Sequence, residues 1–341
     1  MARANAALDV VIAPSKTSFW ALGSALPGKV QGPGIPSGLH WNGHSWSRVT
    51  FPKAVKSGIG CAGSSSAGNV WAFAGTGLFG DGASYAGALH LVNGKWQVSK
   101  SFTPAGLVSG CSVLGNGNAW VYGLTHVGPG VGTWRLRGHT WSRATTGKFD
   151  LVTASEVRAS DVWGIAADSL GSNDVVAHWN GHSWTRNAAM SKYVQGLGTK
   201  TLLELQFINA VGRGNVYVAG SLIPATGPGS TIVLHLSGGT WHKVAPGSAG
   251  YNLPDAVSDG HGGWWATSPP GSYEKASFLL HRAKGKSHWA RVNLPVPHGY
   301  QGSVAGLVRV PGSTAMVALL SLFNGTLALK TEVLAYGKLP K

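Results

Sequence analysis

Histidine is the residue type that most suggests chemistry here, because the chain has 13 histidines and only 12 acidic residues among its 341 residues. Five histidines recur at one position of a repeated motif: His40, His90, His178, His235 and His281. Imidazole suits metal binding and general acid–base catalysis. Copies of one repeat position lie on separate units, however, so they can meet only around a shared axis. We predict structural rings instead, half-buried beside tryptophan, with one ring nitrogen bonded to the backbone.

A second set of residues could bind a ligand through aromatic rings. One aromatic residue follows each outer tryptophan of the repeat by 5–11 residues: Phe51, Phe102, Phe149, Tyr193, Tyr251 and Tyr300. Three further candidates stand in loops expected on the same face: Tyr85, His126 and Tyr273. Loops on a rigid scaffold often carry binding sites, so we predict a ligand-binding face here. The alternative is that each aromatic residue of the first set fills the gap between two repeat units.

Catalytic motifs are missing from the sequence. A glycosidase needs two facing carboxylates, and the sequence marks no such pair among the aspartates of its predicted turns: Asp161, Asp168, Asp174, Asp255 and Asp259. There is no Gly-x-Ser-x-Gly elbow, phosphate-binding loop or Cys-x-x-Cys pair. We therefore expect a protein without catalytic residues, bound metal or cofactor.

The chain is strongly basic, with a formal net charge of +15. Part of this charge recurs two residues after the outer tryptophan: Arg48, Arg143, Arg186, Lys243 and Arg291. Residues two apart on a strand share a face, so we expect each cation to lie over its indole. Charge on an outer strand also discourages edge-to-edge association, and we expect a monomer. The alternative is a rim that grips an anionic polymer; no nucleic-acid motif is present.

The two cysteines, Cys61 and Cys111, stand ten and nine residues before the tryptophans of their repeat units. This position places both in the innermost strands of neighbouring units. A disulfide and two buried thiols both remain open on this spacing. A disulfide would argue for export from the cytoplasm.

Two repeated motifs identify the elements that position these residues. An apolar strand recurs around residues 20, 71, 120, 163, 217, 265 and 316, at intervals of 43–54 residues. A second motif, Leu39-His40-Trp41-Asn42-Gly43-His44-Ser45-Trp46, recurs nearly unchanged at 177–184 and in weaker copies elsewhere. Asn-Gly between alternating apolar runs predicts a tight hairpin with a type I′ turn.

Four short strands for each repeat of about 40–50 residues are typical of a β-propeller. We predict an all-β, single-domain, seven-bladed propeller with four antiparallel strands per blade. The expected blades are 1–50, 51–102, 103–147, 148–192, 193–247, 248–298 and 299–341. The last unit lacks a terminal tryptophan strand. Either the N-terminus supplies that strand and closes the ring, or the blade is incomplete.

The repeats resemble those of bacterial kelch-type propellers, including the central domain of galactose oxidase. They are most similar to actinobacterial proteins with V-W-A-x-G…H-W-N-G-x-x-W repeats, and the resemblance covers nearly the whole chain. It implies an exported protein of the cell envelope or exterior. The longest apolar stretch, 315–323, is too short for a membrane helix. The N-terminus has no apolar signal segment, so a cytoplasmic location stays open.

We expect a non-catalytic binding or scaffolding module that recognises a glycan, a cell-envelope polymer or a protein partner. Two alternatives are a seven-bladed lectin, and a hydrolase or copper oxidase with its site in the pore. Tryptophan–histidine pockets that repeat between blades and open to solvent would favour the lectin. A carboxylate pair about 5–10 Å apart in a cleft would favour a hydrolase.

Overall fold

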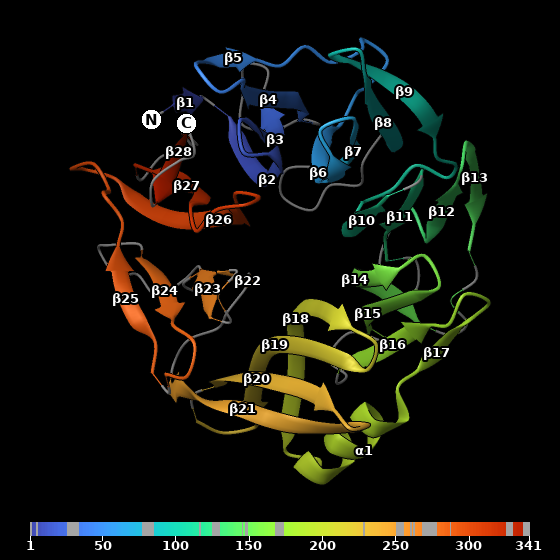
Figure 1. Cartoon of the computed structure of the whole chain (residues 1–341), viewed down its shortest axis with the longest axis vertical. Coiled ribbons are helices and arrows are strands. Elements are labelled where there is room, and N and C mark those ends of the chain that lie inside the picture. The colour runs from blue at the N-terminus through green and yellow to red at the C-terminus, as the bar shows by residue number, and fades with distance from the viewer. Residues whose placement is uncertain are drawn as a thin grey trace.

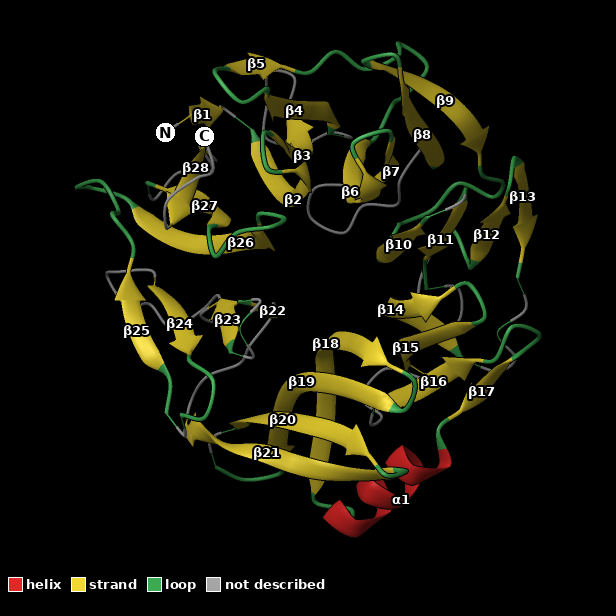
Figure 2. Ribbon diagram, viewed as in Figure 1, coloured by secondary structure: helices red, strands yellow, loops and turns green. Residues whose placement is uncertain are grey.

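The computed structural model contains seven four-stranded sheets around one axis (Figure 1), which confirms the seven-bladed β-propeller. The structure describes residues 2–4, 6–25, 34–76, 85–115, 117–124, 130–144, 146, 149–167, 174–227, 229–249, 256–259, 261, 263–267, 278–286, 288–324 and 330–336. In each blade the first strand lies nearest the axis and the last lies at the rim (Figure 2).

The strands of the blades follow the chain in order. Blade 1 contains β2 (Ala7–Ser15), β3 (Ser18–Ala25), β4 (Ile35–Trp41) and β5 (Trp46–Arg48). Blade 2 contains β6 (Gly58–Ser66), β7 (Asn69–Thr76), β8 (Gly87–Val92) and β9 (Lys95–Ser101). Blade 3 contains β10 (Gly110–Leu114), β11 (Asn118–Tyr122), β12 (Trp134–Arg137) and β13 (Thr140–Arg143). Blade 4 contains β14 (Asp150–Arg158), β15 (Asp161–Ala167), β16 (Val175–Trp179) and β17 (Trp184–Arg186).

The second half of the ring repeats this order. Blade 5 contains β18 (Thr201–Gly212), β19 (Asn215–Pro224), β20 (Ser230–Ser237) and β21 (Thr240–Ala249). Blade 6 contains β22 (Ala256–Ser258), β23 (Trp264–Thr267), β24 (Phe278–Arg282) and β25 (Ala290–Asn293). Blade 7 contains β26 (Gln301–Arg309), β27 (Met316–Phe323), β28 (Lys330–Tyr336) and, from the other end of the chain, β1 (Ala2–Ala4).

The N-terminus closes the ring. Strand β1 pairs antiparallel with β28, with Ala4 opposite Thr331, and the two termini lie side by side in Figure 1. The Thr331 hydroxyl donates to the carbonyl of Ala6 at 2.8 Å and accepts from the amide of Leu8 at 3.0 Å. Of the two possibilities for the last blade, completion by the N-terminal residues is therefore the one that the structure adopts.

The hydrophobic core is divided among the seams between blades. The described residues form seven buried clusters, and each cluster joins two neighbouring blades. The final glycine of the V-W-A-x-G motif has a steric reason, because Gly23 stands opposite Leu8 beside a bulge of β2. A Cβ at Gly23 would overlap the backbone of Ala7 and Leu8. Gly220 meets the bulged β18 in the same way.

The Asn-Gly hairpins are of two kinds. At Asn93-Gly94 both residues have positive φ, 50° and 73°, as a type I′ turn requires. At 42–45 only Gly43 has positive φ, and the Asn42 side chain accepts from the amides of His44 and Ser45 at 3.0 and 2.9 Å. The type I′ prediction is therefore wrong for this copy. Its turn is longer because the asparagine side chain takes the place of a backbone bond.

One helix departs from the all-strand pattern. Helix α1 (Ala188–Leu197) occupies the connector between blades 4 and 5, so the blade boundary expected at residue 192 falls inside it. The Asn187 side chain caps the helix by accepting from the amide of Met190 at 2.8 Å. No helix in the described ranges reaches the length and hydrophobicity that crossing a bilayer requires.

Candidate functional site

The recurrent histidines lie flat on the aromatic residues of the neighbouring strand. Register explains this, because each histidine pairs directly with that residue, as His40 does with Trp20. The ring centroids are 3.8 Å apart for Trp20–His40, 4.2 Å for Trp71–His90, 4.2 Å for Trp163–His178, 4.1 Å for Tyr217–His235 and 4.3 Å for Trp265–His281. The prediction of half-buried rings beside tryptophan is confirmed in four blades, and tyrosine takes its place in blade 5.

The partner of the histidine nitrogen differs from the prediction. Nε2 bonds to a side chain rather than to the backbone, and the partners are Ser18 at 3.1 Å, Asp161 at 2.8 Å, Asn215 at 2.7 Å and Asp259 at 3.1 Å. The first three stand two residues before the stacked aromatic residue, so they share its face of the strand. A polar residue at this position was the sequence signal for the bond.

The chemistry of this acceptor decides how many nitrogens it satisfies. Asp161 accepts from Nε1 of Trp163 at 2.9 Å as well as from His178. In blade 2 Asn69 accepts from Trp71 at 2.7 Å, and Nε2 of His90 has no partner among the described residues. In blade 1 the Ser18 hydroxyl is hydrogen-bonded to His40, and Nε1 of Trp20 has no hydrogen-bond partner among the described residues. Burial lowers the pKa of the His40, His90 and His235 rings.

The predicted ligand-binding aromatic residues do not gather on one open face. Phe102 and Phe149 are only 3% and 5% exposed. Phe102 packs on Trp134 and Trp141 at 5.2 and 5.5 Å in the seam between blades 2 and 3. These two rings fill gaps between blades, as the alternative interpretation held, because the large indoles around them leave no open ring face.

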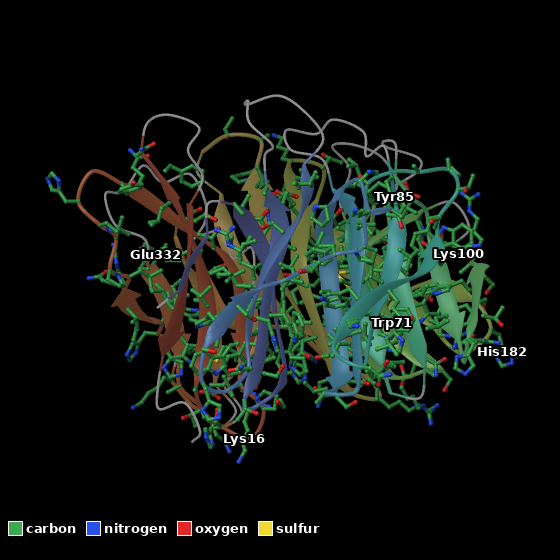
Figure 3. All side chains as sticks on the ribbon, turned by 90° about the horizontal axis from the view of Figure 1, so that it is seen from above. Lys16, Trp71, Tyr85, Lys100, His182 and Glu332 are labelled. Atoms are coloured by element: carbon green, nitrogen blue, oxygen red, sulfur yellow. A yellow bond between two sulfur atoms is a disulfide. The ribbon has the colours of Figure 1, made fainter. Side chains whose placement is uncertain are left out.

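The remaining candidates lie at separate places. Tyr85 is half-buried beside the cluster between blades 1 and 2, and Figure 3 shows it near one face of the ring while Lys16 marks the other. Tyr193 lies on α1, and Tyr300 packs half-buried between blades 6 and 7. Tyr251, His126 and Tyr273 lie outside the described residues, and their role stays a prediction.

Two of the five basic residues after the outer tryptophans lie over other rings than predicted. Arg186 lies 5.8 Å from the ring centroid of Phe149, and Arg291 lies 3.9 Å from that of Phe278. Their own tryptophans, Trp184 and Trp289, pack in the hydrophobic clusters between blades instead.

An open pocket lies at the seam between blades 1 and 2. Its volume is about 540 Å³, and it has aromatic walls from Trp20, His40, Phe51 and Trp96. Trp20 and Trp96 meet edge to face at 5.3 Å, and Phe51 stacks on Trp96 at 6.1 Å. Exposed Arg48 and Lys95 stand among the lining residues. The remaining lining residues are Ser47, Val49, Thr50, Pro52 and Gly94.

A pocket of about 500 Å³ occupies the equivalent place between blades 4 and 5. Both pockets lie between the connector that leaves one blade and the outer hairpin of the next. Gly239-Thr240-Trp241 takes the position of Gly94-Lys95-Trp96, and Tyr193 takes that of Phe51. The helix lines this second pocket in place of the Trp–His pair. Nothing in the sequence pattern alone distinguished these two seams from the others.

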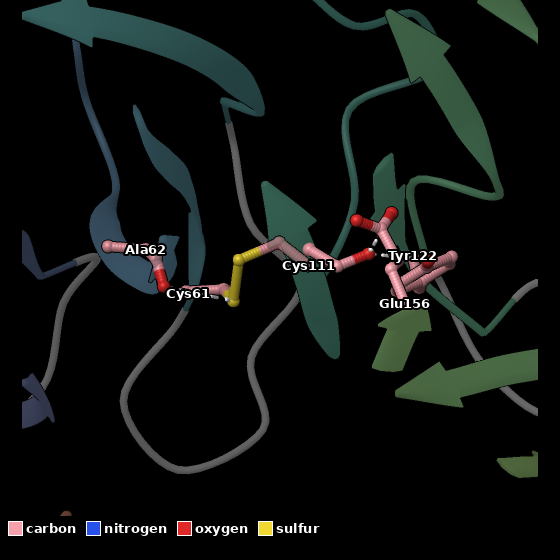
Figure 4. Close-up of a disulfide and its surroundings, with 6 residues drawn as sticks. Cys61, Ala62, Cys111, Tyr122 and Glu156 are labelled. Carbon is pink, nitrogen blue, oxygen red and sulfur yellow. Dashed lines mark hydrogen bonds between the residues drawn. A yellow bond between two sulfur atoms is a disulfide. The ribbon is translucent and has the colours of Figure 1, made fainter. Parts of the chain in front are cut away.

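A disulfide joins Cys61 on β6 to Cys111 on β10, with a Cα–Cα distance of 5.9 Å. It links the innermost strands of blades 2 and 3, so the first of the two possibilities for the cysteines is realised. Figure 4 shows the neighbouring polar cluster, in which Ser112 donates to Glu156 at 2.9 Å and lies 3.0 Å from the Tyr122 hydroxyl.

This polar cluster was not expected from the sequence. Burial raises the pKa of Glu156 to about 8, although the Ser112 hydrogen bond and the charge of Arg135 act in the opposite direction. Arg135 occupies the histidine position of blade 3 and lies over Trp120 and Trp179 at 4.8 and 5.1 Å. Within the described part of the chain, no group of three metal-ligating side chains is present.

Comparison with known proteins was made by sequence and by structure. No family model and no curated protein matches the sequence. Solved structures do match: YCF48 bound to D1 peptide has a TM-score of 0.59 at 12% identity, covering 96% of this chain and 93% of that one. The GH74 xyloglucanase from Xanthomonas campestris has a TM-score of 0.64 at 13% identity, and covers 95% of this chain but 54% of its own.

A third match is a PL25 ulvan lyase bound to -[GlcA(1-4)Rha3S]-, with a TM-score of 0.58 at 11% identity, covering 97% of this chain and 95% of that one. The three proteins named here differ in what their descriptions say they bind or cleave. At this level of identity the likeness extends to the β-propeller fold, and the site residues of this chain must be read on their own.

Proposed function

We propose that this propeller is a non-catalytic saccharide-binding module whose main site is the pocket between blades 1 and 2. The observation that carries the proposal is the aromatic, solvent-open pocket of about 540 Å³ at that seam. Its volume lies within the range of roughly 300–1,000 Å³ that is typical of small-ligand sites. A second pocket lies at the equivalent place between blades 4 and 5, although it lacks the tryptophan–histidine pair of the first.

The chemistry of the lining suits a sugar. A pyranose ring presents C–H groups on its faces and hydroxyls at its edge. Half-buried Phe51 and His40 supply the accessible ring surface over Trp20 and Trp96, which are only 5% and 6% exposed, while Ser47 and Thr50 supply hydroxyls. The walls come from paired strands and the start of the following connector, so the site is largely preformed and little ordering accompanies binding.

Absence of catalysis is part of the proposal. Neither pocket has a carboxylate among its lining residues, whereas glycoside hydrolysis needs two. The xyloglucanase and the ulvan lyase act on polysaccharides by their descriptions, which supports a saccharide ligand. YCF48 was described with a peptide, so a protein partner is the competing outcome. The kelch-like relationship and a location outside the cytoplasm belong to the same proposal, and the disulfide supports that location.

The test is glycan-array binding by the full chain, followed by titration of the best ligand against a blocked pocket. Ser47→Trp places an indole into the opening from an exposed position, and we expect binding to fall at least tenfold. Ser142→Trp makes the same change at the equivalent exposed position of blade 3, and it should leave binding intact. Silence across neutral and acidic glycans, or equal binding by both variants, would overturn this assignment.

A further inference from the structure

The charge of the molecule is unevenly distributed along the ring. Residues 7–149, which span blades 1–3, contain 11 basic residues and two acidic ones, Asp9 and Asp81, for a net charge of +9. The remaining 198 residues carry +6 of the total of +15. The pocket between blades 1 and 2 lies in this basic part of the ring, and the pocket between blades 4 and 5 does not.

The residues that line the two pockets also differ in charge. In the first pocket Arg48 ends β5 and Lys95 begins β9, so two cations stand on the two sides of the seam. Both are exposed, and neither pairs with a carboxylate among the described residues. No acidic residue stands among the described residues that line this pocket. In the second pocket Thr240 replaces Lys95, and Lys192 is the one cation among its described lining residues.

We infer that the pocket between blades 1 and 2 selects acidic saccharides, with the carboxylate or sulfate of the sugar held between Arg48 and Lys95. This inference rests on the proposed function and names its substrate class. Two exposed cations beside one pocket attract an anion, and the basic surroundings raise the local anion concentration. Stacking against the aromatic walls then orients the ring.

The test uses two probes that differ only at C6: methyl glucuronide, which carries a carboxylate, and methyl glucoside, which carries a hydroxymethyl group. Titrations of the full chain are followed by NMR through the indole N–H signals of Trp20 and Trp96. We expect the glucuronide to bind about three- to tenfold more tightly at low salt, in line with one or two exposed charge contacts. At 0.5 M salt the preference should fall below about twofold, because exposed charges are screened.

Matched variants assign the effect to the two cations. Lys95→Thr copies the residue of the other seam, and Arg48→Gln removes the second charge at similar size. Each should reduce the preference about two- to threefold, and the double variant should abolish it. Because both side chains are exposed, folding is checked simply by an unchanged thermal melt.

The possible results separate this inference from the proposed function. Equal binding of the two probes, or a preference that survives high salt or the double variant, would overturn the acidic specificity and leave saccharide binding in place. No shift with either probe or with an acidic oligosaccharide would overturn both. A reduced preference in each single variant and its loss in the double variant would establish the inference.

Discussion

The seams between blades 1 and 2 and between blades 4 and 5 are built on the same plan and are filled differently. In the first, an extended connector leaves Trp20 and His40 as walls of an open pocket. In the second, α1 inserts fully buried Met190 into the core, and Asn187 accepts from Nε1 of Trp241 at 3.0 Å. The comparison shows that the repeat fixes the frame of each seam, while the connector decides which side chains line its pocket: an extended segment in the first seam and a helix in the second.

The largest expected effect concerns Met190, which α1 buries in the cluster between blades 4 and 5. Met190→Ala removes a fully buried side chain from the cluster between blades 4 and 5, and we expect a loss of about 2–5 kcal/mol in the free energy of unfolding. Phe51→Ala at the seam between blades 1 and 2 should cost less than the roughly 3–5 kcal/mol that is typical of a buried phenylalanine, since Phe51 is only partly buried. Urea unfolding measures both. No measurable cost for Met190→Ala would contradict its packing in the core between blades 4 and 5.

The next effect concerns Asp161, which accepts hydrogen bonds from the stacked pair Trp163 and His178. Asp161→Ser reproduces blade 1 in blade 4, leaving one of two buried nitrogens, Nε1 of Trp163 or Nε2 of His178, without a partner. We expect a loss of about 1–3 kcal/mol in the free energy of unfolding. Conserved stability, with an unchanged indole N–H signal of Trp163, would show that these bonds contribute nothing at this seam.

A buried carboxyl group, Glu156, lies between blades 3 and 4 and makes the stability of this seam depend on pH. The folded-state pKa of Glu156 is about 8, above its ordinary value of 4.5, so the folded protein holds one more proton than the unfolded chain between these values. Stability from this group is therefore fully present below pH 4.5 and is lost as the pH rises toward 8. Glu156→Gln should flatten this part of the profile and stabilise the protein at pH 8, on the order of 1–2 kcal/mol. Thermal melts from pH 5 to 8.5 follow the change, and parallel profiles would refute it.

The smallest expected effect comes from the opposite substitution in blade 1, Ser18→Asp. Ser18→Asp supplies a carboxylate that can accept from both Trp20 and His40, as Asp161 does in blade 4, and we expect a gain of about 0.5–1 kcal/mol at pH 7. Burial lowers the pKa of His40 in the wild type, so the unfolded chain takes up a proton first and stability falls below about pH 6.5. The new carboxylate should raise that pKa and shrink the acid loss. NMR titration of His40 measures it, and an unmoved pKa would speak against the shared geometry.

Much of the fold could be predicted because it depends on contacts within one repeat. The Trp20–His40 pairing follows from hairpin register, and the Asn-Gly dipeptides mark the turns. The placement of Phe102 could not be predicted in the same way, because its burial depends on Trp134 and Trp141 of the next blade. The buried Glu156 cluster and the bond between Asn187 and Trp241 likewise bring together residues from neighbouring blades or connectors, whose lengths vary between repeats.

The sequence by itself determined the number of blades, their four strands and the position of histidine beside an aromatic residue, since each rests on local periodicity. Only the tertiary structure decided that the rings stack flat, that β1 completes the last blade, that Cys61 and Cys111 are bonded, and which side chains line the pockets between blades. These outcomes depend on how side chains from different blades share a limited space. The packing between blades depends on residues from two different repeats, so the sequence of a single repeat does not specify it.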